Sequence, residues 1–304
     1  MDPPLIETFA RALPHGITLS CRAAGEPGRP VLVFLHGFPQ AAFVWDDLLA
    51  HFSRPENGGY RCIAPNLRGY EASSSPPEVK DYRARYLVQD IAALMASESG
   101  DTPVAALVAH DWGGAVAWNL ANQQPQLLER LVILNSPHPG TFLRELKTNP
   151  RQQAASLYMN FLARPDAPAL LAADDYRRLW PFFEGEHGAP WLTEEVKDRY
   201  RALWRGGLGL VGPCHYYGAS PMRPPTADDP AAAALELPDA MLEVHRPTLV
   251  MWAMDDVALL PELVDGLQTW VPRLTLKKIE GATHWVLHEQ PGLIAAHLQA
   301  FLGR

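Results

Sequence analysis

The stretch Val108-Ala109-His110-Asp111-Trp112-Gly113-Gly114 decides the fold of this 304-residue chain. An apolar run typical of a buried strand ends there, one polar side chain stands at the turn, and glycine opens an alanine-rich segment of helical spacing. A strand–turn–helix bend of this kind pushes one side chain outward, and small neighbours let the backbone turn sharply. Asp111 stands at the bend and is the first candidate for chemistry.

Asp111 admits two interpretations. As a nucleophile, its carboxylate has an ordinary pKa of about 4 and is ionised at neutral pH without help from a base. Attack on an sp³ carbon leaves an alkyl ester on the enzyme, and a histidine is then needed to activate the water that cleaves this ester. As a structural residue, Asp111 would instead cap the helix that begins at Trp112. Taken alone, the stretch leaves both interpretations open, and the remaining motifs favour the nucleophile.

Outward from this turn, short β-branched runs alternate with segments of helical period. The expected strands are Ile17–Arg22, Val31–His36, Cys62–Pro65, Val104–His110, Leu131–Leu134, Thr248–Trp252 and Leu274–Ile279. The expected helices are Ala42–Phe52, Tyr82–Met95, Gly113–Asn122, Pro261–Trp270 and Gly292–Leu302. Such alternation predicts an α/β fold with a mostly parallel central sheet that helices cover on both faces.

The alternation is interrupted in the middle of the chain. From Thr141 to Tyr217 the sequence is mainly helical in pattern and rich in aromatic residues, without a run typical of a buried strand. A stretch rich in proline and alanine follows at residues 221–238. We therefore expect a helical cap at residues 140–222, inserted between two parts of one core at residues 1–139 and 223–304.

Composition excludes several classes of function. Hydrophobic residues make up 47% and charged residues 20%, as in ordinary globular proteins. The net charge of −8 argues against nucleic-acid binding, and the longest apolar runs fall far short of the ~18 residues of a membrane span. Three cysteines without metal-ligand spacing predict neither a disulfide framework nor a metal site. The first residues show no signal-peptide pattern, so a cytoplasmic location is expected.

A second motif, His36-Gly37-Phe38-Pro39, follows the expected strand Val31–His36. In a sheet of this type the loop lies beside the bend at Asp111 and offers a backbone N–H. The N–H groups of Phe38 and Trp112 would then form a two-donor oxyanion hole, while His36 and Pro39 would line the substrate pocket. The Phe38–Pro39 bond is a candidate for the cis form, which about 5–6% of X-Pro bonds adopt in folded proteins.

The last two motifs supply an acid and a base. The strand Thr248–Trp252 leads to the paired acids Asp255 and Asp256, and the segment Gly281-Ala282-Thr283-His284-Trp285 presents a histidine after the last strand. His284 is the expected general base and Asp256 the acid that orients it, with Asp255 as the competing acid. Trp285 is expected at the substrate pocket.

Together these motifs resemble the epoxide hydrolase branch of the α/β-hydrolase fold family, in particular soluble epoxide hydrolase-like proteins. The resemblance rests on HGFP at 36–39, HDWGG at 110–114, NSPHP at 135–139, Asp256 and GATHW at 281–285, and it extends over essentially the whole chain. It implies hydrolysis of a small-molecule epoxide by water to a vicinal diol, without a cofactor or a metal.

The resemblance also implies two cap tyrosines that donate hydrogen bonds to the epoxide oxygen. Tyr158, ahead of Pro165, matches the first, and Tyr217 matches the second, with Tyr216 as the alternative. Two segments depart from the family pattern: Asp-x-Arg-Gly-Tyr-Gly appears as NLRGYE at 66–71, and Asn-Tyr-Tyr-Arg as HYYG at 215–218. Neither departure removes a proposed catalytic group, but both affect the expected substrate range.

Two rival functions remain at this point. A haloalkane or haloacid dehalogenase would use the same Asp–His–Asp chemistry, although Phe38 stands where haloalkane dehalogenases typically place Asn. A hydrolase-fold protein that binds a ligand with little turnover is the second rival. The presence of every catalytic side chain argues against it.

Overall fold

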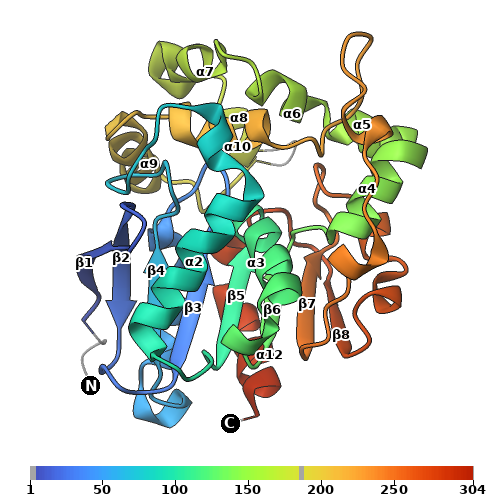
Figure 1. Cartoon of the computed structure of the whole chain (residues 1–304). Helices are drawn as coiled ribbons and strands as arrows, with labels where there is room; N and C mark the ends of the chain where they lie inside the picture. Colours follow the sequence, from blue (N-terminus) through green and yellow to red (C-terminus); the bar gives the residue numbers. More distant parts are fainter. Residues whose placement is uncertain (1–4, 185–187, 304) are drawn as a thin grey trace.

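The structure is a computed structural model that describes residues 5–184 and 188–303. Its centre is an eight-stranded sheet in the order β1-β2-β4-β3-β5-β6-β7-β8 (Figure 1). The strand β2 pairs antiparallel with β1 and with β4, and all other neighbours are parallel. The strands are β1 (Glu7–Ala12), β2 (Thr18–Ala24), β3 (Val31–Leu35), β4 (Arg61–Pro65), β5 (Ala106–His110), β6 (Leu131–Leu134), β7 (Thr248–Ala253) and β8 (Leu274–Ile279). The predicted α/β fold with a mostly parallel sheet is confirmed.

The central strands are buried on both faces. Every residue of β3, β5, β6 and β7 is buried, which explains their continuous apolar sequences. The helices α2 (Ala84–Ser99) and α3 (Trp112–Gln123) pack with one set of alternate strand residues. The helices α1 (Asp46–Phe52) and α12 (Pro291–Leu302) pack with the other set. Apolar burial on both faces thus makes the sheet a rigid base for the loops at its edge.

A layer of helices lies between β6 and β7 in the chain and above the carboxyl ends of the strands (Figure 1). Aromatic rings hold the layer together: the ring centroids of Trp180 and Trp204 are 5.0 Å apart, as are those of Phe183 and Tyr200. The helices are α4 (Pro139–Thr148), α5 (Pro150–Ala155), α6 (Leu157–Leu162), α7 (Ala167–Tyr176), α8 (Trp180–Glu184), α9 (Glu194–Arg205) and α10 (Val211–Ala219). The 3₁₀ turns Ala231–Ala234 and Asp239–Met241 lead back to the sheet.

Several elements differ from the sequence-based expectation: Ala42–Trp45 is a 3₁₀ turn ahead of α1, the short helix α11 (Val286–Glu289) was not predicted, and two further differences have a clear physical reason. The edge strand β1 was not predicted, because it is largely exposed and carries no continuous apolar run. The segment Pro261–Trp270 forms two 3₁₀ turns, Pro261–Val264 and Leu267–Thr269, instead of one helix. Gly266 between them has a left-handed φ of 78°, which interrupts helical geometry.

In the part of the chain that the structure describes, no helix is both long enough and apolar enough to cross a bilayer.

Candidate active site

Asp111 occupies a strained bend between β5 and α3. Its φ of 49° and ψ of −121° lie outside the regions that a non-glycine residue usually adopts. The Ser136 hydroxyl holds the bend by donating to the Asp111 carbonyl at 2.7 Å. A Cβ at Gly113 would collide with the backbone carbonyls of residues 35 and 36, so only glycine allows α3 to begin this close to β3. The local sequence therefore fixes an otherwise unfavourable turn.

The Asp111 carboxylate lies in the predicted pair of amides. The Phe38 N–H donates to Asp111 Oδ1 at 2.6 Å, and the Phe38–Pro39 bond is cis. Burial raises the pKa of Asp111, while the charge of His284 and hydrogen bonds from the N–H groups of Phe38 and Trp112 oppose this shift. Apart from the Trp112 N–H, no N–H group of the first turn of α3 donates to the carboxylate, so the capping interpretation gains no support.

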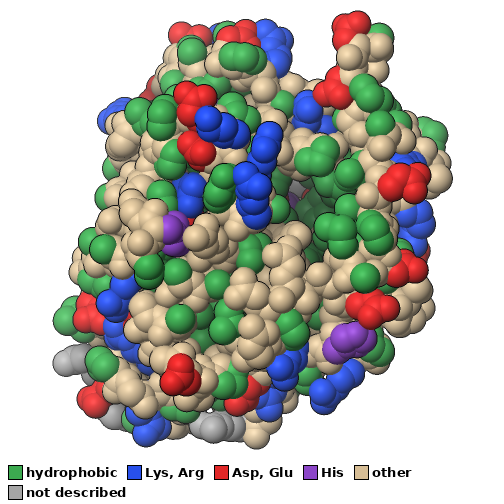
Figure 2. Space-filling model, viewed as in Figure 1, with side chains coloured by type: hydrophobic (Ala, Val, Ile, Leu, Met, Phe, Trp, Pro, Cys, Tyr) green, Lys and Arg blue, Asp and Glu red, His purple; other side chains and the backbone are tan. Residues whose placement is uncertain are grey.

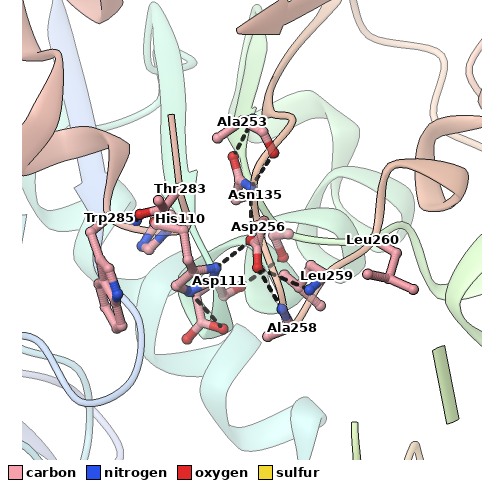
Figure 3. Close-up of polar contacts among 12 residues, drawn as sticks. His110, Asp111, Asn135, Ala253, Asp256, Ala258, Leu259, Leu260, Thr283 and Trp285 are labelled. Atoms are coloured by element: carbon pink, nitrogen blue, oxygen red, sulfur yellow. Dashed lines mark hydrogen bonds and ion pairs between the residues drawn. The ribbon is translucent and has the colours of Figure 1, made fainter. Parts of the chain in front are cut away.

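His284 lies between the carboxylates of Asp256 and Asp111, both labelled in Figure 3. Its Nδ1 donates to Asp256 Oδ2 at 2.7 Å, and its Nε2 is 3.8 Å from Asp111 Oδ2. Burial disfavours the charged imidazole, but the negative charges of Asp256 and Asp111 outweigh burial and raise the pKa of His284. The structure thus brings together the three side chains that the sequence analysis placed in one triad.

Asp256 is almost fully buried at 2% exposure, and its charge is compensated by hydrogen bonds. The N–H groups of Ala258 and Leu259 donate to Oδ1, each at 2.9 Å. Asn135 Nδ2 donates to Oδ2 at 2.8 Å, beside the bond from His284. Burial would raise the pKa of Asp256, but His284 and these donors lower it. The rival acid, Asp255, points into solvent and is exposed.

Sequence reasoning missed the residues that hold the triad in place. Asn135 at the end of β6 binds Asp256 and accepts a bond from the Ala253 N–H at 2.8 Å. His110 Nε2 donates to the His284 carbonyl at 2.9 Å. Glu289 accepts two bonds from Thr283, the residue before His284. The position of Asn135 at the carboxyl end of a strand between β5 and β7 was the available signal for its contact with Asp256.

The two predicted cap tyrosines come from different helices and face each other. The ring centroids of Tyr158 on α6 and Tyr217 on α10 are 6.1 Å apart. Tyr217 also packs edge-on against Phe38, at 5.2 Å, and Trp112, at 5.1 Å. Burial raises the pKa of both phenols, so both remain protonated donors at neutral pH. The alternative, Tyr216, donates its hydroxyl to the Arg68 carbonyl at 2.8 Å instead.

A cavity of about 250 Å³ connects these groups. Asp111, Tyr158 and Tyr217 line it, together with Trp112 and Ser136 and a mainly apolar wall from the cap and the 3₁₀ turns. Figure 2 shows a hollow on one face, bordered by hydrophobic side chains on one side and basic side chains on the other. A pocket of this size and polarity suits a small, largely apolar molecule that meets a few fixed polar groups.

The three residues expected to line the substrate pocket lie outside this cavity. His36 is fully buried, accepts the Leu67 N–H at 3.0 Å and has a pKa lowered by burial to about 4. The Pro39 carbonyl accepts the Trp204 indole N–H at 2.9 Å. The Trp285 indole donates to the Phe182 carbonyl at 3.0 Å. His36 thus joins two loops of the core, whereas Pro39 and Trp285 join the cap to the core. The sequence motifs alone do not reveal these contacts.

Among residues 5–184 and 188–303, no group of three or more His, Cys, Asp or Glu side chains is arranged so that it could hold a metal ion. The groups gathered here are a carboxylate, a histidine–carboxylate pair, two backbone donors and two phenols.

Comparison with known proteins agrees with this geometry. A family model described as alpha/beta hydrolase fold matches residues 30–291. The chain is 32% identical over 282 residues to epoxide hydrolase 1 of Caenorhabditis elegans, covering 92% of this chain and 66% of the longer nematode protein.

Solved structures show the same similarity. A structure described as novel epoxide hydrolases of the alpha/beta hydrolases superfamily, from metagenomes of hot environments, is 36% identical. It aligns over 99% of this chain and all of that chain, with a TM-score of 0.82. An epoxide hydrolase of Bacillus megaterium, solved with an inhibitor, is 26% identical, with 97% and 100% of the two chains covered and a TM-score of 0.85.

Proposed function

The chain belongs to the α/β-hydrolase fold family, in its epoxide hydrolase-like branch, and from this premise we propose that it hydrolyses epoxides through a covalent ester on Asp111. The observation that carries the proposal is the placement of one carboxylate against both a backbone donor and a histidine–carboxylate pair. The Phe38 N–H is 2.6 Å from Oδ1, and His284 Nε2 is 3.8 Å from Oδ2. Residues 140–222 are the proposed cap over this site.

Ring opening is the first half of the reaction. We assign attack on an epoxide carbon to Oδ2 of Asp111, because Oδ1 is held by the Phe38 amide and is placed to become the ester carbonyl oxygen. The carbon–oxygen bond of the ring breaks as the ester bond forms. Tyr158 and Tyr217 donate to the oxygen as negative charge develops on it, and a proton from this pair yields the alcohol.

Ester hydrolysis is the second half. His284 removes a proton from water, the resulting hydroxide attacks the ester carbonyl, and the N–H groups of Phe38 and Trp112 stabilise the tetrahedral oxyanion. As the intermediate collapses, the bond between the ester carbonyl carbon and the diol oxygen breaks, and the imidazolium of His284 protonates that oxygen as the diol leaves. The carboxylic acid formed at Asp111 loses its proton, and the tyrosine pair regains the proton that it gave up in ring opening, so the enzyme returns to its starting state. Asp256 keeps the imidazole in the correct tautomer and stabilises its charged form.

The charges of the site favour this order of events. In the free enzyme the Asp111 carboxylate is one of the groups that raise the pKa of His284. Formation of the ester removes that negative charge, so the pKa of His284 falls when the histidine must act as a base. Alkylation of Asp111 thus prepares His284 for the hydrolytic step.

Intact-mass spectrometry tests the separate roles of Asp111 as the nucleophile and His284 as the base in ester hydrolysis. The His284→Ala variant should open an epoxide and then stall, so the protein should become heavier by one substrate mass. The Asp111→Ala variant should show neither adduct nor turnover. An unmodified His284→Ala protein, after prolonged incubation with an epoxide that the parent protein hydrolyses, would contradict the proposal.

The two adjacent acids supply a matched control. Asp256→Asn leaves His284 without its anionic partner, so we expect ester hydrolysis to slow by a factor of about 10³–10⁴. Asp255→Asn alters an exposed side chain of the same type one residue away and should retain the parental rate.

A further inference from the structure

A buried glutamine of the proposed cap joins two segments of the active site. Gln152 lies on α5, and its side chain is fully buried. Its Nε2 donates to the Ser156 hydroxyl oxygen and to the Ala258 carbonyl, each at 2.8 Å. Its Oε1 accepts the Leu260 N–H at 3.0 Å, so both N–H groups and the oxygen of the amide are used. Gln152 is not among the described residues that line the cavity, so any effect on the substrate passes through these partners.

The first partner segment holds the acid of the triad. Ala258 and Leu259 donate their N–H groups to Asp256 Oδ1, each at 2.9 Å, in the loop that Figure 3 shows. The Leu259 N–H and the Ala258 carbonyl belong to one peptide unit, which is planar and rigid. Gln152 binds the carbonyl of this unit on one side, and Asp256 accepts the N–H on the other. Fixing the carbonyl therefore fixes the direction of an N–H that orients Asp256, and the two bonds to one peptide strengthen each other.

The second partner segment carries one of the two phenols. Ser156, also fully buried, is the N-cap residue of α6, the helix that carries Tyr158. The bond from Gln152 to the Ser156 hydroxyl thus fixes the start of this helix. Tyr158 and Leu259 line the same cavity as Asp111. One amide is therefore bonded both to the segment of the phenol and to the segment of the acid.

We propose that Gln152 is a positioning residue for both halves of the reaction, because it holds the peptide that orients Asp256 and the helix start that places Tyr158. This inference rests on the proposed function. Ring opening uses Tyr158, and ester hydrolysis uses His284, which Asp256 orients. Since Gln152 comes from the proposed cap and residues 258–260 from the core, the triad is held in place only when the cap is seated on the core.

Single-turnover kinetics separate the two halves. Excess enzyme is mixed with an epoxide that the parent protein hydrolyses, and the mixture is quenched in acid at successive times. Loss of epoxide gives the rate constant of ring opening, and decay of the esterified protein, measured by intact mass, gives that of ester hydrolysis. Gln152→Met keeps the length of the side chain but loses its bonds to all three partners. Both rate constants should fall by at least about tenfold, because a misplacement of about 1 Å can lower a rate about 10²-fold.

Two narrower variants divide the bonds of Gln152 between the two halves. Gln152→Glu keeps an acceptor for the Leu260 N–H and for the Ser156 hydroxyl, but it places an oxygen against the Ala258 carbonyl and so breaks that contact. It should slow ester hydrolysis by at least about tenfold and leave ring opening within about twofold of the parental rate. Ser156→Ala should do the reverse, with ring opening slower by about three- to tenfold and ester hydrolysis at the parental rate. Partial unfolding lowers the amount of protein that reacts and not one rate constant alone, so these variants test the proposal even where Gln152→Met does not fold.

The pH dependence of ester hydrolysis is a readout that a general structural defect leaves unchanged. In the ester the nucleophile carries no charge, so Asp256 is the main group that raises the pKa of His284. The other nearby groups, Glu289 and the neutral His110, are the same in parent and variant. Looser orientation of Asp256 in Gln152→Met should lower the pKa of His284. The acid limb of the profile, where the imidazole is protonated and inactive as a base, should therefore move to lower pH.

Gln153→Met is the matched control. Gln153 is the next residue, and its amide donates to the Leu146 carbonyl within the proposed cap, at 2.8 Å. This variant should keep both parental rate constants and the parental pH profile. Unchanged kinetics in Gln152→Met or Ser156→Ala, or equal slowing in Gln153→Met, would overturn the positioning role and leave epoxide hydrolysis standing. Absence of an ester on the His284→Ala variant would instead overturn the proposed function itself.

Discussion

Asp256 shows how a buried charge is made stable at the scale of single residues. Four hydrogen-bond donors from three different segments surround the two oxygens of its carboxylate. These bonds offset the free-energy cost of removing the charged carboxylate from water. Because the imidazole of His284 takes one of these bonds, its ring orientation is fixed by the same network. Asn135, which directly follows β6, also takes part, so the triad depends on a residue that performs no chemistry.

The two cap phenols provide the test between epoxide and halide chemistry. Tyr158→Phe and Tyr217→Phe should each slow epoxide alkylation at least tenfold, because losing one positioned donor typically costs a factor of about 10²–10³. A halide leaves as a weakly basic anion and gains far less from a phenol donor. Single-turnover rates of adduct formation measure the effect, and the double variant should be nearly inactive.

Tyr216→Phe is the matched control for these two variants. Its hydroxyl donates to the Arg68 carbonyl, so its loss affects the joint between cap and core and not the oxygen of the substrate. Parental alkylation rates in both Tyr158→Phe and Tyr217→Phe, or a preference of the parent for haloalkanes over every epoxide tested, would favour the dehalogenase alternative.

Residues that act through local patterns were predictable, and residues that act through tertiary contacts were not. Asp111 was predictable because it is a polar residue between a strand pattern and a pair of glycines. His284 was predictable because it lies in a loop after the last expected strand. His36 belongs to an equally distinct motif, yet it is turned towards the Leu67 amide and away from the cavity. A motif fixes the path of the backbone, but the direction of each side chain depends on packing partners far away in the sequence.

At the scale of elements, α10 is seated on the core by an unusually close approach of two backbones. A Cβ on Gly212 would collide with the backbone of Gly69, which follows β4. The Tyr216 hydroxyl ties the same helix to the carbonyl of residue 68. Since α10 also carries Tyr217, the position of one proposed phenol depends on this glycine contact.

Gly212→Ala should therefore displace α10 and reduce activity. Inserting a methyl group into a tight contact typically costs about 1–3 kcal/mol of stability. A misplacement of about 1 Å can lower a rate about 10²-fold, so we expect kcat/KM for an epoxide to fall at least tenfold. Gly206→Ala is the control in the cap, because the atom nearest to its new Cβ lies 3.4 Å away, an ordinary contact distance. Equal activity of the two variants would contradict this role of Gly212.

Elements with a regular spacing of apolar residues were predictable from the sequence. Elements that depend on pairing with another strand or on the backbone conformation of one residue were not. The expected Leu131–Leu134 and Leu274–Ile279 agree with β6 and β8 at both ends. The exposed β1 offers no such signal, because its main contribution is the backbone ladder that it forms with β2. In Pro261–Trp270 the apolar period is helical, but a single left-handed glycine overrides it.

At the scale of the whole molecule, several neutral histidines are buried, His36 and His138 within the core and His288 against Tyr200 and Trp191 of the cap. Burial lowers the pKa of His36, His138 and His288 from the ordinary 6.5 to about 4. These groups bind protons between pH 6.5 and 4 in the unfolded chain but remain neutral in the folded one. Their contribution to stability is therefore complete above pH 6.5 and is lost as the pH falls towards 4. For the fully buried His36 and His138, this amounts to about 3 kcal/mol each.

Two catalytic groups, His284 and Asp111, act in the opposite sense, whereas the lowered pKa of Asp256 adds to the loss of stability at low pH. The raised pKa of His284 contributes stability below pH 6.5 and loses it as the pH rises through the folded value. The raised pKa of Asp111 favours the folded state only as that carboxyl becomes protonated at lower pH. Stability should consequently decline on the acid side, first because of the buried histidines and at lower pH also because of Asp256.

Proton uptake on unfolding measures these histidines directly. At pH 5 an unfolded histidine is almost fully protonated and a folded one with a pKa near 4 mostly neutral, so each buried histidine takes up about one proton. His138 accepts the Gly140 N–H through Nδ1 and donates to the Leu242 carbonyl, contacts that a glutamine can partly replace. The His138→Gln variant should take up about one proton fewer than the parent protein when urea unfolds both at pH 5, as measured by titration to constant pH. At pH 8, where folded and unfolded forms of His138 are both neutral, the two proteins should not differ. Equal uptake at pH 5 would show that His138 is already charged in the folded state, contrary to its burial against Trp270 and Trp118.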